Sequence, residues 1–126
     1  MYIYANPNPG NKTVGDCVIR ALSLLLDLSW DQVYDELTDL GHEMYDMPSS
    51  NQVWSEYLYT KGYSRSIIPD TCPFCYRVCD FCDDHLSGRY LLAIGTHVVT
   101  VIDGDYYDTW DSGQEIPIYY FKRRNK

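Results

Sequence analysis

An Asp-Gly dipeptide near the C-terminus constrains the fold of this chain more tightly than any other short stretch. It separates two runs rich in β-branched and aromatic residues, at 97–102 and 106–110. An Asp-Gly pair between such runs is the strongest local signal for a two-residue β-hairpin loop, because both turn positions then need a positive φ. We therefore predict a hairpin closed by Asp103-Gly104, in which Ile102 lies opposite Asp105.

This register also determines which polar side chains of the hairpin share a face. Val99 then lies opposite Asp108, and His97 lies opposite Trp110. Because successive side chains point to opposite faces of a strand, His97, Val99 and Asp108 share one face. Asp108 is diagonal to His97, at a separation that long side chains bridge. A carboxylate there would hold the imidazole in one tautomer and leave its other nitrogen to face a thiol.

The first half of the chain has a helical period instead. Apolar residues recur at three- and four-residue spacing over 16–28, in a stripe so wide that this helix is expected to be central. A second helix is expected over 30–40, with Ser29 as its N-cap and Gly41 as its stop. A third helix is expected over 51–61, which completes an α-rich lobe.

The second half has the pattern of short strands, which are expected at 63–68, 89–94, 97–102, 106–110 and 116–121. A short helix or loop is expected at 76–85. Near the N-terminus, residues 2–4 are expected to form an edge strand. The predicted fold class is α+β. The N-terminal helical lobe lies on one side of a C-terminal antiparallel sheet, and the helix that starts near residue 16 packs on that sheet. At 126 residues the chain is expected to form a single domain, 1–126.

Charge and cysteine content narrow the choice of partners and compartment. The net charge of −8 argues against binding to nucleic acid or to anionic lipid. No apolar stretch reaches the roughly 18 residues of a membrane span, and the start lacks the regions of a signal peptide. Five cysteines, an odd number, fit a reducing compartment better than a disulfide framework. We expect a cytoplasmic protein with neither nucleic-acid nor membrane partners.

A cysteine opens the central helix. A free thiol has a pKa of about 8.5, and a position in the first helical turn lowers it because unpaired amides and the helix dipole stabilise the thiolate. Asp16 is expected to cap this turn by accepting amide hydrogen bonds while pointing away from the sulfur. Taken alone, Cys17 could be a small buried hydrophobe and His97 a structural strand histidine. Taken together with Asp108, they read as nucleophile, base and orienting carboxylate; Asp111 is a rival for the third role on the opposite face.

The order of cysteine at a helix start, histidine on a strand and Asp on the next strand resembles the papain-like cysteine peptidases. With Asp in place of Asn, it is most similar to the compact bacterial and phage branch, such as the bacteriocin-leader peptidases. The resemblance touches residues 11–27 and 90–113, and Asp108-Thr109-Trp110 is similar to the family's Asn-Ser-Trp, in which the Trp shields the histidine from water. It implies that Asn11, six residues before Cys17, stands where the family has an oxyanion-binding Gln, with the Cys17 amide as second donor.

The resemblance implies a cysteine hydrolase (a peptidase, isopeptidase or amidase) that acts on a peptide or protein substrate and needs no cofactor for catalysis. Two other functions remain open on the sequence. One is a papain-like fold without catalytic activity that is reused for binding, for example in a phage protein. The other is a zinc-stabilised interaction module in which Cys17 only packs.

Two Cys-x-x-Cys units lie between the lobes, Cys72 with Cys75 and Cys79 with Cys82. Paired units of this kind are typical of zinc held by four thiolates, although the short gap between them strains such a site. The alternatives are reduced thiols on a short helix, with Cys79 and Cys82 on one face, or a redox-sensitive pair. His85 could replace one sulfur as a ligand.

The sequence predicts that iodoacetamide at neutral pH alkylates Cys17 selectively, because only this thiol has a helix start and a candidate base to ionise it. Peptide mapping by mass spectrometry after brief, substoichiometric labelling would locate the modified cysteine. Labelling confined to residues 72–82 would contradict the catalytic interpretation.

Overall fold

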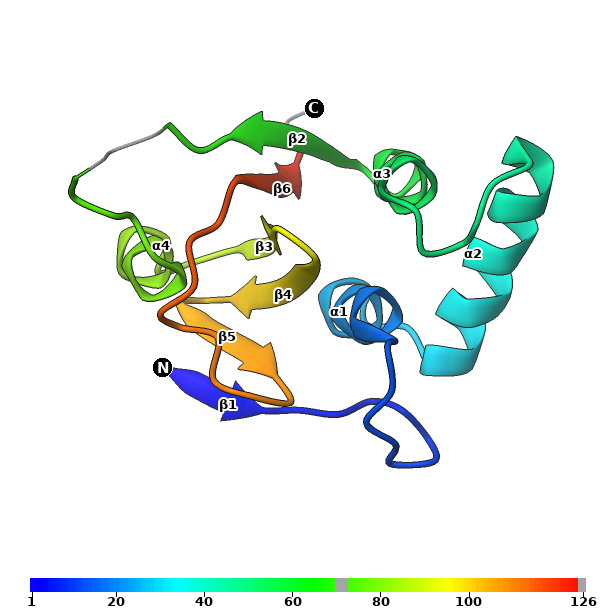
Figure 1. The fold of residues 1–126 in the computed structure, drawn as a ribbon, viewed down its shortest axis with the longest axis horizontal. Coiled ribbons are helices and arrows are strands. Elements are labelled where there is room, and N and C mark those ends of the chain that lie inside the picture. Colours follow the sequence, from blue (N-terminus) through cyan, green and yellow to red (C-terminus); the bar gives the residue numbers. More distant parts are fainter. Residues whose placement is uncertain (70–72, 125–126) are drawn as a thin grey trace.

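The fold is built on one six-stranded sheet with helices against both of its faces (Figure 1). The computed structural model describes residues 1–69 and 73–124. In chain order its elements are β1 (Tyr2–Tyr4), α1 (Cys17–Leu26), α2 (Trp30–Met44), α3 (Asn51–Thr60), β2 (Tyr63–Ile67), α4 (Val78–Asp84), β3 (Arg89–Ile94), β4 (His97–Ile102), β5 (Asp105–Asp108) and β6 (Tyr119–Arg123). The strand order is β1-β5-β4-β3-β6-β2. The predicted α+β class is confirmed.

The β4–β5 hairpin has the predicted register. Ile102 pairs with Asp105 and Thr100 with Tyr107. Asp103 and Gly104 both have positive φ, at 51° and 82°, as a two-residue turn of this kind requires. Turn chemistry alone was therefore sufficient to align these two strands.

The sheet is mixed, so the prediction of an antiparallel sheet is wrong at one edge. β1 is the edge strand that was predicted, but it runs parallel to β5, with Tyr2 opposite Tyr106 and Tyr4 opposite Asp108. A three-residue strand carries no signal that identifies its partner. β6 also begins at Tyr119 rather than at 116, because Pro117 has no amide hydrogen for the ladder.

The prediction that the helices lie on one side of the sheet is also wrong. Alternate residues of β3 are buried against different helices: Leu91 and Ala93 belong to the core under α1, α2 and α3, whereas Leu92 and Ile94 belong to the core with α4. Strands buried on both faces read as nearly continuous apolar runs, as residues 90–94 of β3 and, apart from Thr100, residues 98–102 of β4 do. The short α4 gave too weak a periodic signal to reveal that it covers the second face.

The central helix α1 is fixed against β4 along its length. Its Leu22 and Leu25 side chains are fully buried. The buried Thr100 hydroxyl of β4 donates a hydrogen bond of 2.6 Å to the Ala21 carbonyl. At the C-terminal end, the Arg89 guanidinium donates to the carbonyls of Leu24 and Leu25, which satisfies acceptors that the helix leaves free. These contacts hold the start of α1 in place relative to the start of β4.

The second helix continues past its predicted stop at Gly41 and ends at Met44. Gly41 is a helical residue, and a Cβ added there would lie 2.9 Å from the Asp46 carbonyl oxygen and 3.2 Å from the Pro48 nitrogen. This glycine therefore allows the α2–α3 loop to fold back against α2, and Tyr45 in the left-handed region ends the helix.

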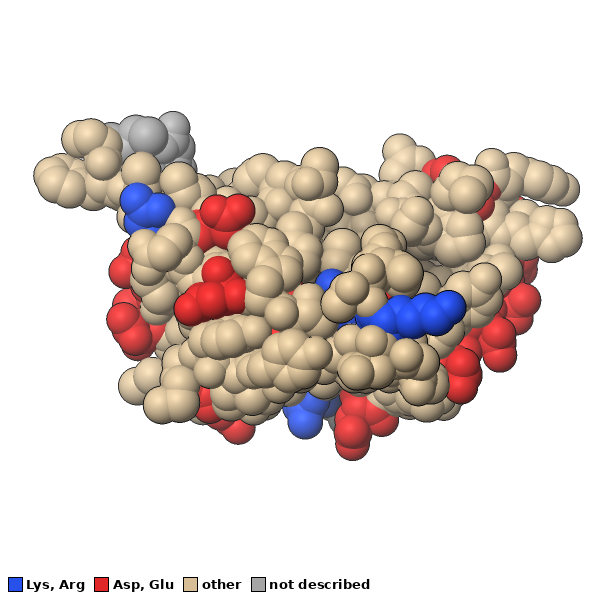
Figure 2. All heavy atoms as spheres, turned by 60° about the horizontal axis from the view of Figure 1, so that its bottom comes forward, with Lys and Arg blue, Asp and Glu red and all other residues tan. Residues whose placement is uncertain are grey.

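The outer surface of α2 is acidic, and Figure 2 shows the acidic side chains gathered along the margin where α2 lies.

Among the described residues, no helix has the length and apolar character needed to cross a membrane.

Gly41→Ala should destabilise the protein by about 1–3 kcal/mol, because the backbone of the α2–α3 loop must move away from the new methyl group. The higher helix propensity of Ala, about 1 kcal/mol, works against this loss. Urea unfolding monitored by circular dichroism measures it, with Thr38→Ala at an exposed α2 position as a control expected to change stability by less than about 0.5 kcal/mol. A Gly41→Ala protein as stable as the wild type would show that this close approach does not constrain the loop.

Candidate active site

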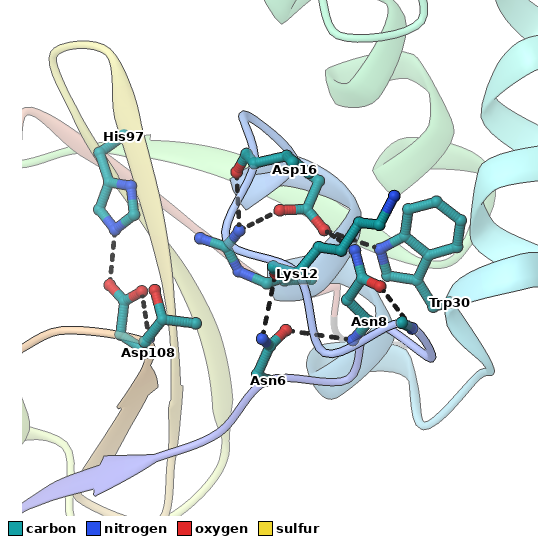
Figure 3. Close-up of polar contacts among 11 residues, drawn as sticks. Asn6, Asn8, Lys12, Asp16, Trp30, His97 and Asp108 are labelled. Carbon is teal, nitrogen blue, oxygen red and sulfur yellow. Dashed lines mark hydrogen bonds and ion pairs between the residues drawn. The ribbon is translucent and has the colours of Figure 1, made fainter.

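The imidazole of His97 is bound to the carboxylate of Asp108, at a distance of 2.5 Å from Nε2 to Oδ2 (Figure 3). Asp108 is only 5% exposed, and it has two further donors. The buried Ser112 hydroxyl donates to Oδ2 at 3.0 Å, and the Thr109 amide donates to Oδ1 at 2.8 Å. The carboxylate is therefore held in one orientation before it meets the imidazole.

Residues in and directly after the edge strand β1 hold the main chain of Asp108 in place. The amide of Ala5 and the hydroxyl of Tyr2 both donate to the main-chain carbonyl of Asp108, at 3.0 and 3.2 Å. The edge strand β1, whose partner strand the sequence did not identify, thus helps to hold Asp108 in place.

Cys17 is the first residue of α1, and its thiol and the imidazole of His97 line the same cleft, where the imidazole acts on the pKa of the thiol. Because Nε2 of His97 is bound to Asp108, Nδ1 is the ring nitrogen left for the sulfur. Burial of Cys17 raises the pKa of the thiol. The hydrogen bond and positive charge of His97 lower it, as do a hydrogen bond from the Val98 main chain and the charge of Arg20, and the net effect is a lowered pKa.

His97 is shifted in the opposite direction. Burial by itself lowers its pKa, but the hydrogen bonds and charges of Asp108 and Cys17 outweigh burial and raise the pKa to about 9. A thiol with a lowered pKa beside an imidazole with a raised pKa favours transfer of the proton to the imidazole. Both shifts therefore favour the thiolate–imidazolium form of the pair over the neutral form.

Asp16 does not cap α1, contrary to the sequence prediction. Its carboxylate forms a buried ion pair with Arg20, one turn along the helix, and accepts hydrogen bonds of 3.0 Å from the Trp30 indole and from the Asn8 amide (Figure 3). It therefore points away from the sulfur, as expected. The carboxylate is occupied by Arg20, Trp30 and Asn8, and Asp16 leaves the first turn without a side-chain cap.

The consequence is that the first-turn amides of α1 receive no side-chain cap from Asp16. The free amides and the positive end of the helix dipole can then stabilise negative charge on the sulfur or on an oxygen beside it.

The loop that precedes α1 is held by asparagine side chains. Asn8 Oδ1 accepts a hydrogen bond from the Gly10 amide, and Asn6 Nδ2 donates one to the Lys12 carbonyl (Figure 3).

A cleft of about 240 Å³ opens beside Cys17 and His97. It lies between the start of α1, the α2–α3 loop, the first turn of α3 and the turn from β3 to β4. Sequence analysis did not assign Ser49, Asn51, Trp54 and Tyr119 to the site, although all four line this cleft. No local signal could have shown this, because Asn51 and Trp54 read as the start and buried face of a helix and approach Cys17 only through tertiary packing.

The ring of Trp110 lies 4.9 Å from the ring of His97, centroid to centroid, and covers part of the imidazole. The neighbouring Asp111, the rival for the third role, is directed elsewhere. Its carboxylate accepts hydrogen bonds from the Tyr106 hydroxyl and, at 3.0 Å, from the Gly113 amide. Of the two carboxylates, Asp108 is therefore the one that contacts His97.

Asn11 is not brought into the cleft. It is exposed in the loop before α1, has a φ of 52°, and donates its main-chain amide to the Asn8 carbonyl at 2.9 Å. It is not among the residues that line the cleft. The oxyanion role implied for its side chain has no geometric support, and the Cys17 amide is the remaining candidate donor.

Of the predicted zinc ligands, Cys72 lies outside the described residues. Cys75 is exposed, while Cys79 and Cys82 lie on α4. Burial raises the pKa of the Cys82 thiol to about 11. Within residues 1–69 and 73–124, no group of three or more His, Cys, Asp or Glu side chains is arranged to hold a metal ion.

In the described part of the chain, His85 belongs to an aromatic cluster and not to a metal-binding group with the cysteines. Its ring stacks on Phe81 with centroids 3.8 Å apart, and its Nδ1 lies 2.8 Å from the Phe81 carbonyl oxygen.

Comparisons of the chain with protein-family models, with curated proteins and with solved structures found no match. The chemistry of the site is therefore inferred from its geometry.

Asp108→Asn should lower the pKa of His97 from about 9 toward its ordinary value of 6.5, because the variant removes the carboxylate that stabilises the imidazolium. In the wild type this raised pKa adds stability that is complete below pH 6.5 and is lost as the pH rises through about 9. That pH dependence should shrink in the variant. NMR titration of the His97 ring protons measures the pKa directly.

Asp111→Asn is the matched control for this titration, since Asp111 contacts Tyr106 and Gly113 rather than the imidazole. It should leave the titration of His97 unchanged. A wild-type His97 that titrates at 6.5 would contradict the ion pair.

Proposed function

We propose that this protein is a cysteine hydrolase with a papain-like arrangement of its active site. It would cleave a peptide, isopeptide or other amide bond through Cys17, His97 and Asp108. One observation carries this proposal: a single imidazole is bound to a buried carboxylate and lines the same cleft as a thiol at the start of a helix. This is the arrangement of nucleophile, base and orienting group that covalent acyl transfer needs.

In the first half-reaction, the Cys17 thiolate attacks the carbonyl carbon of the scissile amide. The negative charge that develops on the carbonyl oxygen is stabilised by the Cys17 amide and the positive end of α1. The His97 imidazolium then donates its proton to the leaving nitrogen as the C–N bond breaks. The products are a free amine, a thioester on Cys17 and a neutral imidazole.

In the second half-reaction, neutral His97 removes a proton from a water molecule, and the resulting hydroxide attacks the thioester carbon. The C–S bond breaks, the carboxylic acid leaves, and the thiolate and imidazolium are restored. Asp108 stabilises the imidazolium in both halves of the cycle, and it keeps Nδ1 directed at the reacting atoms. Trp110 limits the access of water to the imidazole.

A second candidate function is a non-catalytic binding module that uses the same cleft. The position of Asn11 favours it, because this exposed residue supplies no side-chain donor for an oxyanion at Cys17. Loss of one such donor from a hydrolase costs about 10²–10³ in kcat. The two candidates therefore differ in turnover rather than in whether a peptide can occupy the cleft.

The hydrolase should cut members of a pooled library of quenched fluorescent peptides, and Cys17→Ala and His97→Ala should each lower kcat/KM by at least about a thousandfold. Cys79→Ala, on α4 rather than α1, is the matched control and should retain activity. The rate should rise with pH as Cys17 ionises and fall as His97 loses its proton near pH 9.

Mass spectrometry of the library would also detect slow cleavage. Saturable binding of library peptides, with no cleavage and no covalent capture of peptidyl vinyl sulfones by Cys17, would favour the binding module.

A further inference from the structure

A separate hollow lies on the face of the sheet that α4 covers. We call it the α4 pocket; it has a volume of about 320 Å³ and lies between α4, the end of β2 and Tyr120 of β6. In Figure 1, α1 and α4 lie on opposite sides of β3 and β4. No residue that lines the α4 pocket also lines the cleft beside Cys17. The pocket is therefore distinct from the candidate active site.

Aromatic side chains form a large part of the α4 pocket, which is lined by Tyr76, Phe81, His85 and Tyr120. The rings of Phe81 and His85 are nearly parallel, at 12°, with centroids 3.8 Å apart. The ring of Tyr120 is inclined to both of them, at 61° to Phe81 and 56° to His85. The rings thus form a corner rather than one continuous stack, so a single ligand in the pocket can contact more than one aromatic side chain.

The α4 pocket also has an acidic wall. The carboxylate of Asp84 lines it, and the Tyr76 hydroxyl donates a hydrogen bond of 2.7 Å to Oδ2 of that carboxylate. Of the described residues that line the pocket, none is Lys or Arg. Lys122, two residues beyond Tyr120 on β6, is not among them. The pocket therefore combines aromatic rings with a negative charge.

This combination favours a cation, because the face of an aromatic ring carries a partial negative charge that adds to the charge of a carboxylate. The remaining walls restrict which cation fits. Ile67, Ile68 and Pro69 have no polar side-chain atom to accept a hydrogen bond. A primary ammonium or a guanidinium would lose water from several N–H groups there, whereas a trimethylammonium group has no N–H and would place its methyl groups against apolar walls.

The volume of the α4 pocket limits the size of the ligand. At about 320 Å³ it is near the lower end of the range of roughly 300–1,000 Å³ for pockets that hold small molecules. We therefore infer that the α4 pocket binds a trimethylammonium group, held by the rings of Tyr76, His85 and Tyr120 and by the carboxylate of Asp84. A small quaternary ammonium solute and a trimethylated lysine both carry this group. The inference does not depend on the proposed hydrolase activity.

The test is an NMR titration of the full chain with choline chloride at constant ionic strength, compared with 3,3-dimethylbutan-1-ol. This alcohol has the shape of choline, but a carbon atom replaces the charged nitrogen. Choline should bind saturably with a Kd below about 10 mM, and at least about fivefold more tightly than the alcohol. The resonances of the Tyr76, His85 and Tyr120 rings should shift with the same Kd.

Asp84→Asn removes the charge but keeps an oxygen that can accept from the Tyr76 hydroxyl, and it should reduce the preference for choline over the alcohol to less than about twofold. Asp83→Asn is the matched control. It makes the same change in net charge at an exposed α4 position that does not line the pocket, and it should keep the wild-type preference.

A second pair of variants tests the aromatic wall. Tyr76→Leu replaces a ring by an aliphatic side chain and should weaken choline binding by at least about threefold. Tyr59→Leu, at an exposed position on α3, should leave choline binding unchanged. If Tyr76→Leu fails to fold, the comparison of Asp84→Asn with Asp83→Asn decides the result.

The assignment is overturned if choline does not bind saturably, if the alcohol binds as tightly as choline, or if Asp84→Asn and Asp83→Asn change the preference equally. Titration with Nα-acetyl-Nε-trimethyllysine methylamide then separates the two sources of the group. Tighter binding than choline would indicate a modified lysine of a partner protein, and equal or weaker binding would indicate a free solute; both results support the site.

Discussion

The packing of α1 against β4 is the contact on which the other features of this protein depend. Cys17 begins the helix and His97 begins the strand, so the distance between sulfur and imidazole is set by how these two elements lie together. Leu22 and Leu25 of α1 are buried in the apolar layer, and the Thr100 hydroxyl of β4 forms a hydrogen bond with the Ala21 carbonyl within it. A shift of α1 along β4 would separate the thiol from the imidazole without disturbing either of them locally.

Two buried carboxylates lie near the site, and their partners give them different electrostatic effects on Cys17 and His97. Asp108 is directed at His97 and stabilises the imidazolium. Asp16 immediately precedes the thiol, where a free negative charge would oppose the thiolate, but Arg20 neutralises it inside the protein. The charge of Arg20 also lowers the pKa of Cys17. The ion pair at the start of α1 is therefore compatible with an ionised cysteine directly after an aspartate.

The sequence predicted the parts of the fold that local chemistry controls. Asp103-Gly104 gave the hairpin register, and that register brought His97 and Asp108 to one face. Predictions failed where a residue serves a distant contact. Gly41 was read as a helix stop, but its missing side chain makes room for the α2–α3 loop. Asp16 was read as a cap, but it is paired with Arg20 and with Trp30 of the next helix.

By itself, the sequence determined the α+β class, the hairpin and the residues with the chemistry for a nucleophile, a base and an orienting group. Periodicity and turn preferences are properties of neighbouring residues, so they can be read without coordinates. Only the tertiary structure decided that β1 supports Asp108, that Asn11 stays outside the cleft, and that Ser49, Asn51 and Trp54 line it. These facts depend on how separate elements pack, and no local pattern specifies the side chains that meet across such a boundary.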